Sequence, residues 1–361
     1  MVFRAAVLIS FLTLGCSAGT AGLEIPPAQR ATESEIDAAR PQVALPHSTL
    51  DGSVNKDCES GRWCLRTIAG GGEPFGDGPA TEVFLSSVTA LAVHPDGRVY
   101  FSDRNTSAPI GVIENGYLRR FENSEITFRA KPDRFWLPDG LAIDRDGGLL
   151  ISDLSHRVRR LEGGELFPVV GQSALPARHN HFPTGGHVDG PLYVAELDVP
   201  IGIAMDSRRR MLIAEAGNRM LRWVENQQVS TLMTLDEQPW GVAVDGQDRF
   251  YVLLRDSGTI LTVEDRVVRI LESDDLNLAS PHGIAVDDEG RLFVADTGHG
   301  VIKMIDKGVV TIIAGGGAQT EDGLATSVKI SRPHSVAVGP DGSIYIGESY
   351  PGRIRRLYRN E

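Results

Sequence analysis

Cysteine is scarce in this sequence, and so is positive charge. Only three of the 361 residues are cysteine, and the net charge is −12. Three thiols are too few for a zinc site built from cysteines. The acidic balance argues against nucleic acid as the main partner, because phosphate binding needs a basic face. The chain also lacks a phosphate-binding P-loop and a His-Glu-x-x-His helix. Composition and motifs therefore indicate no standard catalytic class.

The sequence has no apolar run long enough to cross a membrane, but a short one stands at its start. Arg4 precedes an apolar segment at residues 5–14, which predicts an export signal. The signal ends in Leu-Thr-Leu-Gly-Cys16, an imperfect match that resembles a bacterial lipobox. We expect residues 1–16 to be a signal peptide and Cys16 to carry a lipid, which would anchor the protein to a bacterial membrane. An ordinary signal peptide with an incidental cysteine, and a periplasmic protein, is the alternative. Ser17 follows the cysteine and weakly favours the outer membrane.

Residues 17–64 lack any periodicity and are rich in small, polar and charged residues, which predicts a flexible tether. Cys58 and Cys64 are the two remaining cysteines. Export implies an oxidising compartment, so we expect them to form a disulfide. A ring of this size should stabilise the fold by about 2 kcal/mol.

From residue 88 onward, one unit recurs six times. The clearest copy, residues 281–298, reads PHGIAVDDEGRLFVADTG, and residues 137–153 read LPDGLAIDRDGGLLISD. The other four copies are VPIGIAMDSRRRMLIAE at 199–215, PWGVAVDGQDRFYVLL at 239–254, RPHSVAVGPDGSIYIGE at 332–348 and the degenerate VTALAVHPDGRVYFSD at 88–103. A repeat of this period predicts an array of identical structural units.

Each unit predicts four short antiparallel strands. An apolar run, a turn rich in Asp and Gly, and an alternating run are followed by two further strands. Four strands repeated radially are a β-propeller blade, and no long amphipathic helix is expected after residue 65. The last copy ends after its third strand. Residues 66–72 (RTIAGGG) match the fourth strand of the fifth copy at 311–317 (TIIAGGG). We therefore predict that the N-terminal strand completes the last blade and removes an open sheet edge.

These motifs resemble the NHL repeat. The pattern Pro-x-Gly-[Ile/Val/Leu]-Ala-Val-Asp carries the likeness, as does the linker Gly-Gly-Gly-x-x-x-Gly-Asp-Gly-Pro-Ala-Thr at 70–81. The resemblance implies an all-β, six-bladed propeller over residues 65–361. NHL-like propellers include interaction modules, recognition domains, lyases and hydrolases, so the fold alone does not indicate the activity.

One residue per blade should form a ring at a mouth of the central channel. Each stands just before the apolar core of the innermost strand, and the register of the repeat picks out Thr89, Asp139, Ile201, Trp240, His282 and His334. Five of them, all but Ile201, are candidate ligand-binding residues.

His282, His334 and Asp139 could together bind a divalent transition metal with an open position. The Pro-His pairs resemble those of peptidyl-amidating lyases, which ligate zinc with histidines from alternate blades. Here the histidines come from adjacent blades, so that mechanism does not carry over. The alternative is that both histidines make structural hydrogen bonds across strand ends. Trp240 could stack on a ligand or plug the channel.

Charged residues also recur around the repeat. Acids end the second strand in five copies, and we interpret them as hydrogen-bond acceptors for the following turn: Asp103, Asp153, Glu215, Asp296 and Glu348. The arginines near the third strands, among them Arg120, Arg159 and Arg355, are interpreted as solvated blade faces. The longest insertion, at 171–200, contains His179, His181 and His187 and a decayed copy of the linker.

Three functions remain open from the sequence. The first is a monomeric binding propeller of the cell envelope that recognises a protein, a peptide or a glycan. The second is a metal-dependent lyase or hydrolase at the channel mouth, with catalytic residues that the sequence does not assign. The third is a structural scaffold.

Overall fold

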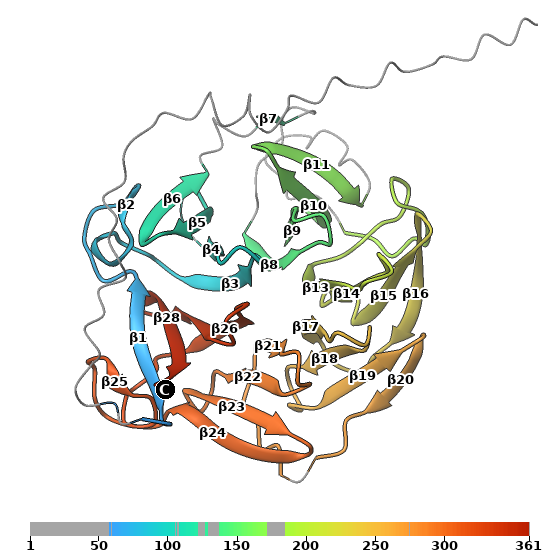
Figure 1. The fold of residues 1–361 in the computed structure, drawn as a ribbon. Coiled ribbons are helices and arrows are strands. Elements are labelled where there is room, and N and C mark those ends of the chain that lie inside the picture. Colours follow the sequence, from blue (N-terminus) through green and yellow to red (C-terminus); the bar gives the residue numbers. More distant parts are fainter. Residues whose placement is uncertain are drawn as a thin grey trace, which may run out of the picture. The chain divides into compact units, whose positions relative to one another are not determined.

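The protein is an all-β propeller of six sheets arranged around a central channel (Figure 1). The computed structural model describes residues 58, 60–104, 106, 108–121, 127–128, 137–171, 185–273 and 275–360. The predicted signal peptide, Cys16 and residues 17–57 of the predicted tether lie outside these residues. Within the described part of the chain, no helix is long and apolar enough to cross a membrane.

Blades one to three each contain four antiparallel strands and one short additional strand at the outer edge. In order from the channel outward they are as follows. Blade one has β3 (Val88–Val93), β4 (Val99–Asp103), β5 (Ile110–Glu114), β6 (Tyr117–Phe121) and β2 (Gly78–Pro79). Blade two has β8 (Pro138–Ile143), β9 (Leu149–Asp153), β10 (Arg157–Glu162), β11 (Glu165–Val170) and β7 (Thr127–Phe128). Blade three has β13 (Pro200–Met205), β14 (Met211–Glu215), β15 (Met220–Glu225), β16 (Gln228–Thr234) and β12 (Gly190–Pro191).

Blades four and five have four strands each in the described residues, and blade six has five. Blade four has β17 (Pro239–Val244), β18 (Phe250–Leu254), β19 (Ile260–Glu264) and β20 (Val267–Ile270). Blade five has β21 (Gly283–Val286), β22 (Leu292–Asp296), β23 (Val301–Asp306) and β24 (Val309–Gly315). Blade six has β26 (Pro333–Val338), β27 (Ile344–Ser349), β28 (Gly352–Arg359), β1 (Trp63–Ala69) and β25 (Gly323–Leu324). A 3-10 turn, η1 (Ala80–Glu82), follows β2.

The ring is closed as the sequence predicted. Strand β1 pairs antiparallel with β28, from Trp63 opposite Arg359 to Ala69 opposite Ile354. The N-terminal strand is thus the fourth strand of blade six (Figure 1). The expected disulfide joins Cys58 to Cys64, with their Cα atoms 6.0 Å apart, at the start of this strand.

The linker motif forms a fifth strand, which the sequence analysis did not anticipate. In blade six, Asp322 of the linker accepts hydrogen bonds from the backbone N–H and the hydroxyl of Thr67, both at 2.9 Å. In blade three, Asp189 accepts the same pair of bonds from Thr231 at 2.9 and 3.0 Å. The decayed linker copy therefore makes the same hydrogen bonds to the neighbouring strand as the intact copy. Of the histidines in this insertion, His179 and His181 lie outside the described residues.

A second repeated aspartate shapes the turn between the first and second strands. The Oδ1 atom of Asp287 accepts the backbone N–H groups of Glu289 and Arg291. Asp144, Asp206 and Asp245 accept the corresponding bonds in blades two, three and four. A side-chain carboxylate that binds nearby backbone groups favours a tight turn. The recurring Asp of the sequence motif is therefore the turn-forming residue.

The interpretation of the arginines near the third strands as solvated was wrong for four that are buried, Arg120, Arg157, Arg159 and Arg355, whereas Arg119 is exposed as predicted. The acids that end the second strands are all fully buried, and each pairs with a buried cation: Asp103 with Arg120, Asp153 with Arg159, Glu215 with Arg222, Asp296 with Lys303 and Glu348 with Arg355. Most of these acids also accept N–H groups from the loop before the innermost strand, as Glu215 does from Asp198, rather than from the following turn. A buried charge needs a partner, and each of these five blades supplies its own.

Two blades depart from this pattern, but neither leaves a buried charge without its partner. In blade four the acid is replaced by Leu254 and the cation by Leu261, and both leucines are buried in the same hydrophobic cluster. In blade one the third strand has Gly111 at the cation's position, because a Cβ atom there would lie 2.3 Å from the Phe101 ring. The cation comes instead from Arg120 on the next strand, directly opposite Gly111. The charges are present or absent as a pair.

Candidate functional site

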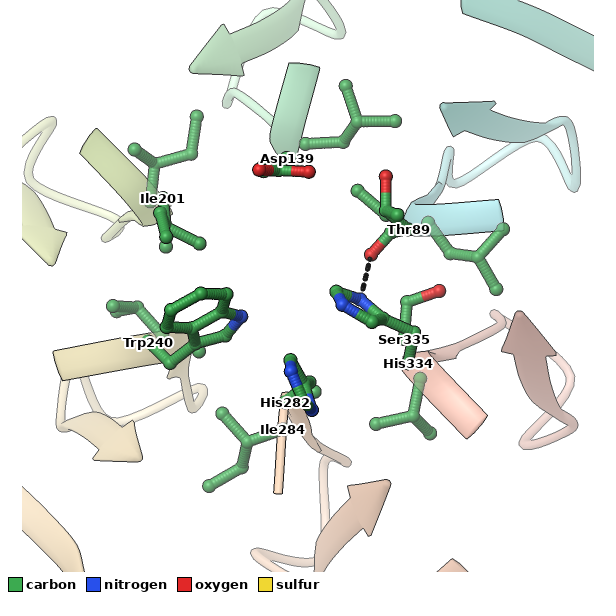
Figure 2. A pocket seen from close by; sticks show the side chains of 18 residues that line it. Thr89, Asp139, Ile201, Trp240, His282, Ile284, His334 and Ser335 are labelled. Carbon is green, nitrogen blue, oxygen red and sulfur yellow. Dashed lines mark hydrogen bonds between the residues drawn. The ribbon is translucent and has the colours of Figure 1, made fainter. Parts of the chain in front are cut away.

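The six ring residues predicted from the register do line one cavity at the channel mouth. Figure 2 shows Thr89, Asp139, Ile201, Trp240, His282 and His334 around a common opening. Each stands at or just before the start of an innermost strand, so all six share one end of the channel. A glycine follows the ring residue in four blades. At Gly202, for example, a Cβ atom would lie 2.1 Å from the backbone oxygen of Trp240. Glycine therefore lets neighbouring inner strands approach closely and draws the ring together.

The opening is narrow. Its cavity volume is about 60 Å³, whereas sites for drug-sized ligands usually measure roughly 300–1,000 Å³. Water occupies about 30 Å³ per molecule in the liquid. The channel end therefore accepts a small polar group or a few water molecules, and a larger ligand has to rest on the mouth.

The tautomer of His282 follows from its hydrogen bonds. Its Nδ1 atom lies 2.8 Å from the hydroxyl oxygen of Thr297. That hydroxyl donates its only proton to the backbone oxygen of Pro333, at 2.5 Å. The hydroxyl must then accept from His282, so Nδ1 carries the proton. In the neutral ring this leaves Nε2 as a hydrogen-bond acceptor.

His334 is oriented in the same way. Its Nδ1 atom lies 3.0 Å from the backbone oxygen of Thr89, the contact drawn as a dashed line in Figure 2. A carbonyl oxygen can only accept, so Nδ1 donates and Nε2 is again the acceptor. The two imidazole rings lie side by side, with centroids 4.2 Å apart. The structural hydrogen bonds considered from the sequence are thus present, and they leave each ring one atom for other use.

Both histidines are held neutral. Burial lowers the pKa of His282 to about 3, and the neighbouring His334 and the charge of Arg255 add to the effect. Burial likewise lowers the pKa of His334 to about 4, against a hydrogen bond to Thr89 that favours the charged form. At neutral pH each ring therefore offers an uncharged Nε2 lone pair.

Asp139 occupies the far side of the opening from His282 (Figure 2). Its side chain is buried, and its Oδ2 atom lies 3.5 Å from a guanidinium nitrogen of Arg104. Burial raises the pKa of this carboxyl group, and Arg104 and Thr89 oppose that effect. Among the described residues, the Oδ1 atom has no hydrogen-bond partner. Asp139 thus contributes a third acceptor to the cavity wall.

Trp240 holds an arginine at the mouth. The guanidinium carbon of Arg255 lies 4.5 Å from the centre of the indole ring, a cation–π contact. The ring of His282 stands nearly perpendicular to the indole, at 86° and 5.2 Å between centroids. Trp240 is therefore neither a simple plug nor an isolated platform, because it packs on a histidine and positions a positive charge.

The predicted metal set is not formed. In the part of the chain that the structure describes, no three His, Cys, Asp or Glu side chains gather closely enough to hold a metal ion. The physical reason is that Asp139 lies across the opening and pairs with Arg104, while the two histidines stack on each other. The register of the repeat correctly places His282, His334 and Asp139 on one ring, but it gives no information about the distances between them across the channel.

A larger cavity, of about 340 Å³, lies at the opposite ends of the inner strands. The first-to-second-strand turns of blades one, five and six line it, with Val93, Val286 and Val338 as its floor. Its buried carboxylate, Asp287, is already bound to its own turn and to Arg291. The histidine mouth is the stronger candidate site, because polar atoms with unused hydrogen-bonding capacity converge there.

Comparison with known proteins agrees with the fold. Residues 278–303 match the model of the NHL repeat, so the chain is a six-bladed propeller that contains an NHL repeat. A search of curated proteins finds no match to this sequence.

Several solved structures share the architecture. An auxiliary nutrient binding protein from Bacteroides ovatus is 13% identical, with a TM-score of 0.61 over 84% of this chain and 78% of that one. A streptogramin B lyase is 16% identical, with a TM-score of 0.57 over 84% of this chain and 100% of that one. A gluconolactonase from Xanthomonas campestris is 12% identical, with a TM-score of 0.57 over 84% of this chain and 96% of that one. Likeness at this level of identity shows the fold alone.

Proposed function

We propose that this protein is a binding propeller of the bacterial cell envelope, and that the mouth formed by Trp240, His282, His334 and Asp139 recognises its ligand. The observation that carries the proposal is the convergence of three acceptor atoms and the Trp240–Arg255 pair on one rigid opening. Hydrogen bonds fix the two histidine rings before any ligand arrives. Such preorganisation lowers the entropic cost of binding.

Binding is favoured over acid–base catalysis by the basicity of the histidines. A general base works best when its pKa is near the working pH. The pKa values of about 3 and 4 make His282 and His334 weak bases at neutral pH. They are well suited to accept hydrogen bonds, and poorly suited to remove protons from a substrate.

The proposal extends to location and to the class of partner. The signal and lipobox at residues 1–16 support export and anchoring through Cys16. Proteins called auxiliary nutrient binding proteins are among the structural neighbours, from Bacteroides thetaiotaomicron and Bacteroides ovatus. We therefore infer a glycan or peptide ligand at the cell envelope.

The test is a binding screen of the purified protein against glycan and peptide arrays. For any ligand found, Trp240→Ala should weaken binding at least tenfold, because it removes both an apolar wall and the support of Arg255. Tyr193→Ala is the matched control, since Tyr193 is 77% exposed and follows the linker strand of blade three. Equal affinity in the Trp240 variant, or no ligand in either array, would count against the proposal.

A lyase or hydrolase is the second candidate, because two neutral histidines side by side are also a catalytic resource. The neighbours include a virginiamycin B lyase from Staphylococcus aureus in which a histidine-to-alanine substitution is catalytically inactive. Turnover of lactone and ester substrates that disappears in a His282→Ala/His334→Ala double variant would establish this candidate. Elemental analysis of the same two proteins tests metal binding. We expect no stoichiometric transition metal in either, since a third ligand is not in place.

A further inference from the structure

The two histidines and Asp139 give the mouth three hydrogen-bond acceptors, whereas the indole N–H of Trp240 and the hydroxyl of Ser335, which line the same cavity, can donate. His282 and His334 have their Nδ1 protons committed to Thr297 and Thr89, so only the Nε2 lone pairs remain. Asp139 adds the buried Oδ1 atom, which has no partner among the described residues. A buried acceptor without a donor is costly. A ligand that satisfies these three acceptors must therefore bring donors, such as hydroxyl groups, which can also accept from Trp240 or Ser335.

The surroundings of these acceptors are positively charged. The charges of Arg255 and Arg332 depress the pKa of both histidines, and Arg104 also acts on His334. Arg104 is offset by its contact with Asp139. In the described part of the chain, no carboxylate lies within ion-pairing distance of Arg255 or Arg332. Two uncompensated arginines thus flank the mouth of a protein whose net charge is −12.

The acceptors and the nearby arginines together restrict which donor groups a ligand can bring to the mouth. A metal cation or an ammonium group would meet the arginines' repulsion, whereas hydroxyl groups are neutral donors. The same arginines attract a carboxylate, for which the guanidinium fork is geometrically suited. Hydroxyl donors and a carboxylate on one small molecule describe a sugar acid.

We propose that the ligand is a polyhydroxylated carboxylate, that is, a sugar acid either free or as the terminal unit of an acidic glycan. The inference rests on the proposed binding function and makes its ligand class specific. A whole sugar ring is too large to enter the opening of about 60 Å³, so one hydroxyl enters it and donates its proton to one of the acceptors. The ring then rests on the mouth, and its carboxylate faces Arg255 and Arg332.

Trp240 has a defined part in this arrangement. By stacking under Arg255, it restricts a long side chain that would otherwise lose conformational entropy on binding. Arg255 follows directly after Leu254, the position at which blade four has lost its buried acid. Arg255 is a specificity-determining residue in this proposal, and Trp240 is a positioning residue.

The test measures binding of full-length protein by titration calorimetry with defined probes. These are D-glucuronate, D-galacturonate and D-gluconate, the methyl ester of D-galacturonate, and hexanoate. We expect at least one sugar acid to bind, its affinity to fall as salt rises, the ester to bind at least tenfold more weakly, and hexanoate not to bind. Arg255→Gln should reduce the difference between acid and ester, because only Arg332 then faces the carboxylate, while leaving the weak ester binding in place. Arg269→Gln, an exposed arginine on the outer strand of blade four, is the matched control and should behave as wild type.

The outcomes separate this inference from the function on which it rests. Equal affinity for acid and ester, or hexanoate binding as well as the acids, overturns the sugar-acid assignment. Failure of all three acids while a peptide or neutral glycan binds through Trp240 also overturns it, but leaves the binding function standing. Failure of every probe and every array ligand overturns both.

Discussion

The buried pair of Glu215 and Arg222 in blade three allows a quantitative test of why charges recur in these blades. Both side chains are fully buried, and their nearest atoms lie 2.8 Å apart. Arg222 also donates to Asp189 at 2.7 Å. Removing Arg222 leaves the buried Glu215 without its cation, which typically costs about 3–5 kcal/mol. We therefore expect Arg222→Leu to lower the free energy of unfolding by about that amount at pH 7. Glu215→Leu should cost less, because Arg222 keeps Asp189 as a partner.

The double variant should be far milder. Glu215→Leu/Arg222→Leu reproduces the Leu254 and Leu261 pair that blade four already contains. Exchange of a buried ion pair for apolar residues is often close to neutral. The backbone groups that lose their hydrogen bonds to these side chains should still lower the free energy of unfolding by about 2 kcal/mol. The coupling energy in the double-mutant cycle should therefore be several kcal/mol.

The assay is urea unfolding followed by tryptophan fluorescence and circular dichroism. Asp146 and Arg209 form the matched control, because their ion pair is exposed, at 49% and 62%, so solvent screens it and its cycle should show a far smaller coupling energy. A second readout is pH. Burial already raises the pKa of Glu215, and losing Arg222 should raise it further. The instability of Arg222→Leu should then develop as pH rises above the unfolded value of about 4.3 and ease in acid. Additive losses in the Glu215–Arg222 cycle would refute the reasoning.

Three further predictions concern the mouth and the turns. The pKa values of His282 and His334, about 3 and 4, lie below the usual 6.5, so unfolding takes up protons as pH falls below about 6.5. Each histidine should then cost up to about 1.4 kcal/mol of stability per pH unit. Between pH 7 and 4 the melting temperature should therefore fall less steeply for a His282→Gln/His334→Gln variant than for the wild type. Parallel curves of melting temperature against pH would contradict this. Gly111→Ala should destabilise by roughly 1–3 kcal/mol, because its methyl group would overlap Phe101; an unchanged urea midpoint would contradict this. Lys307→Asn should stabilise by roughly 0.5 kcal/mol, because Lys307 has a φ of 49° in a hairpin turn that favours asparagine; a lower melting temperature would show that the strain is absent.

The repeat carries enough information to predict the architecture from the sequence alone. Its two apolar runs and Asp-Gly turns specify strands, and the match between residues 66–72 and 311–317 located the closing strand. Because the repeat keeps register, it also placed Trp240, His282 and His334 at one mouth. These features depend on local pattern and on periodicity, which a single sequence displays.

What the sequence did not show depends on distances between strands. Arg222 and Arg355 have the alternation of a solvated strand, and only the sheet reveals that an acid from the second strand lies beside each. A signal was present in hindsight, since acid and cation recur together and are lost together at Leu254 and Leu261. The metal hypothesis depended on the same missing information, because spacing along the chain does not give the separation of His282, His334 and Asp139 across a channel.

Closure by β1 imposes an order on folding. The strand Trp63–Ala69 is synthesised early, yet its partner Gly352–Arg359 is made almost 300 residues later. The two strands can pair only after the second has been synthesised. Blades one to five can assemble from neighbouring segments in the meantime, whereas the last blade joins the most distant contacts in the molecule, the slowest kind to form. During synthesis, the first strand must therefore remain without this partner until the last strand has been made. The propeller becomes a closed ring only at the end of its own synthesis.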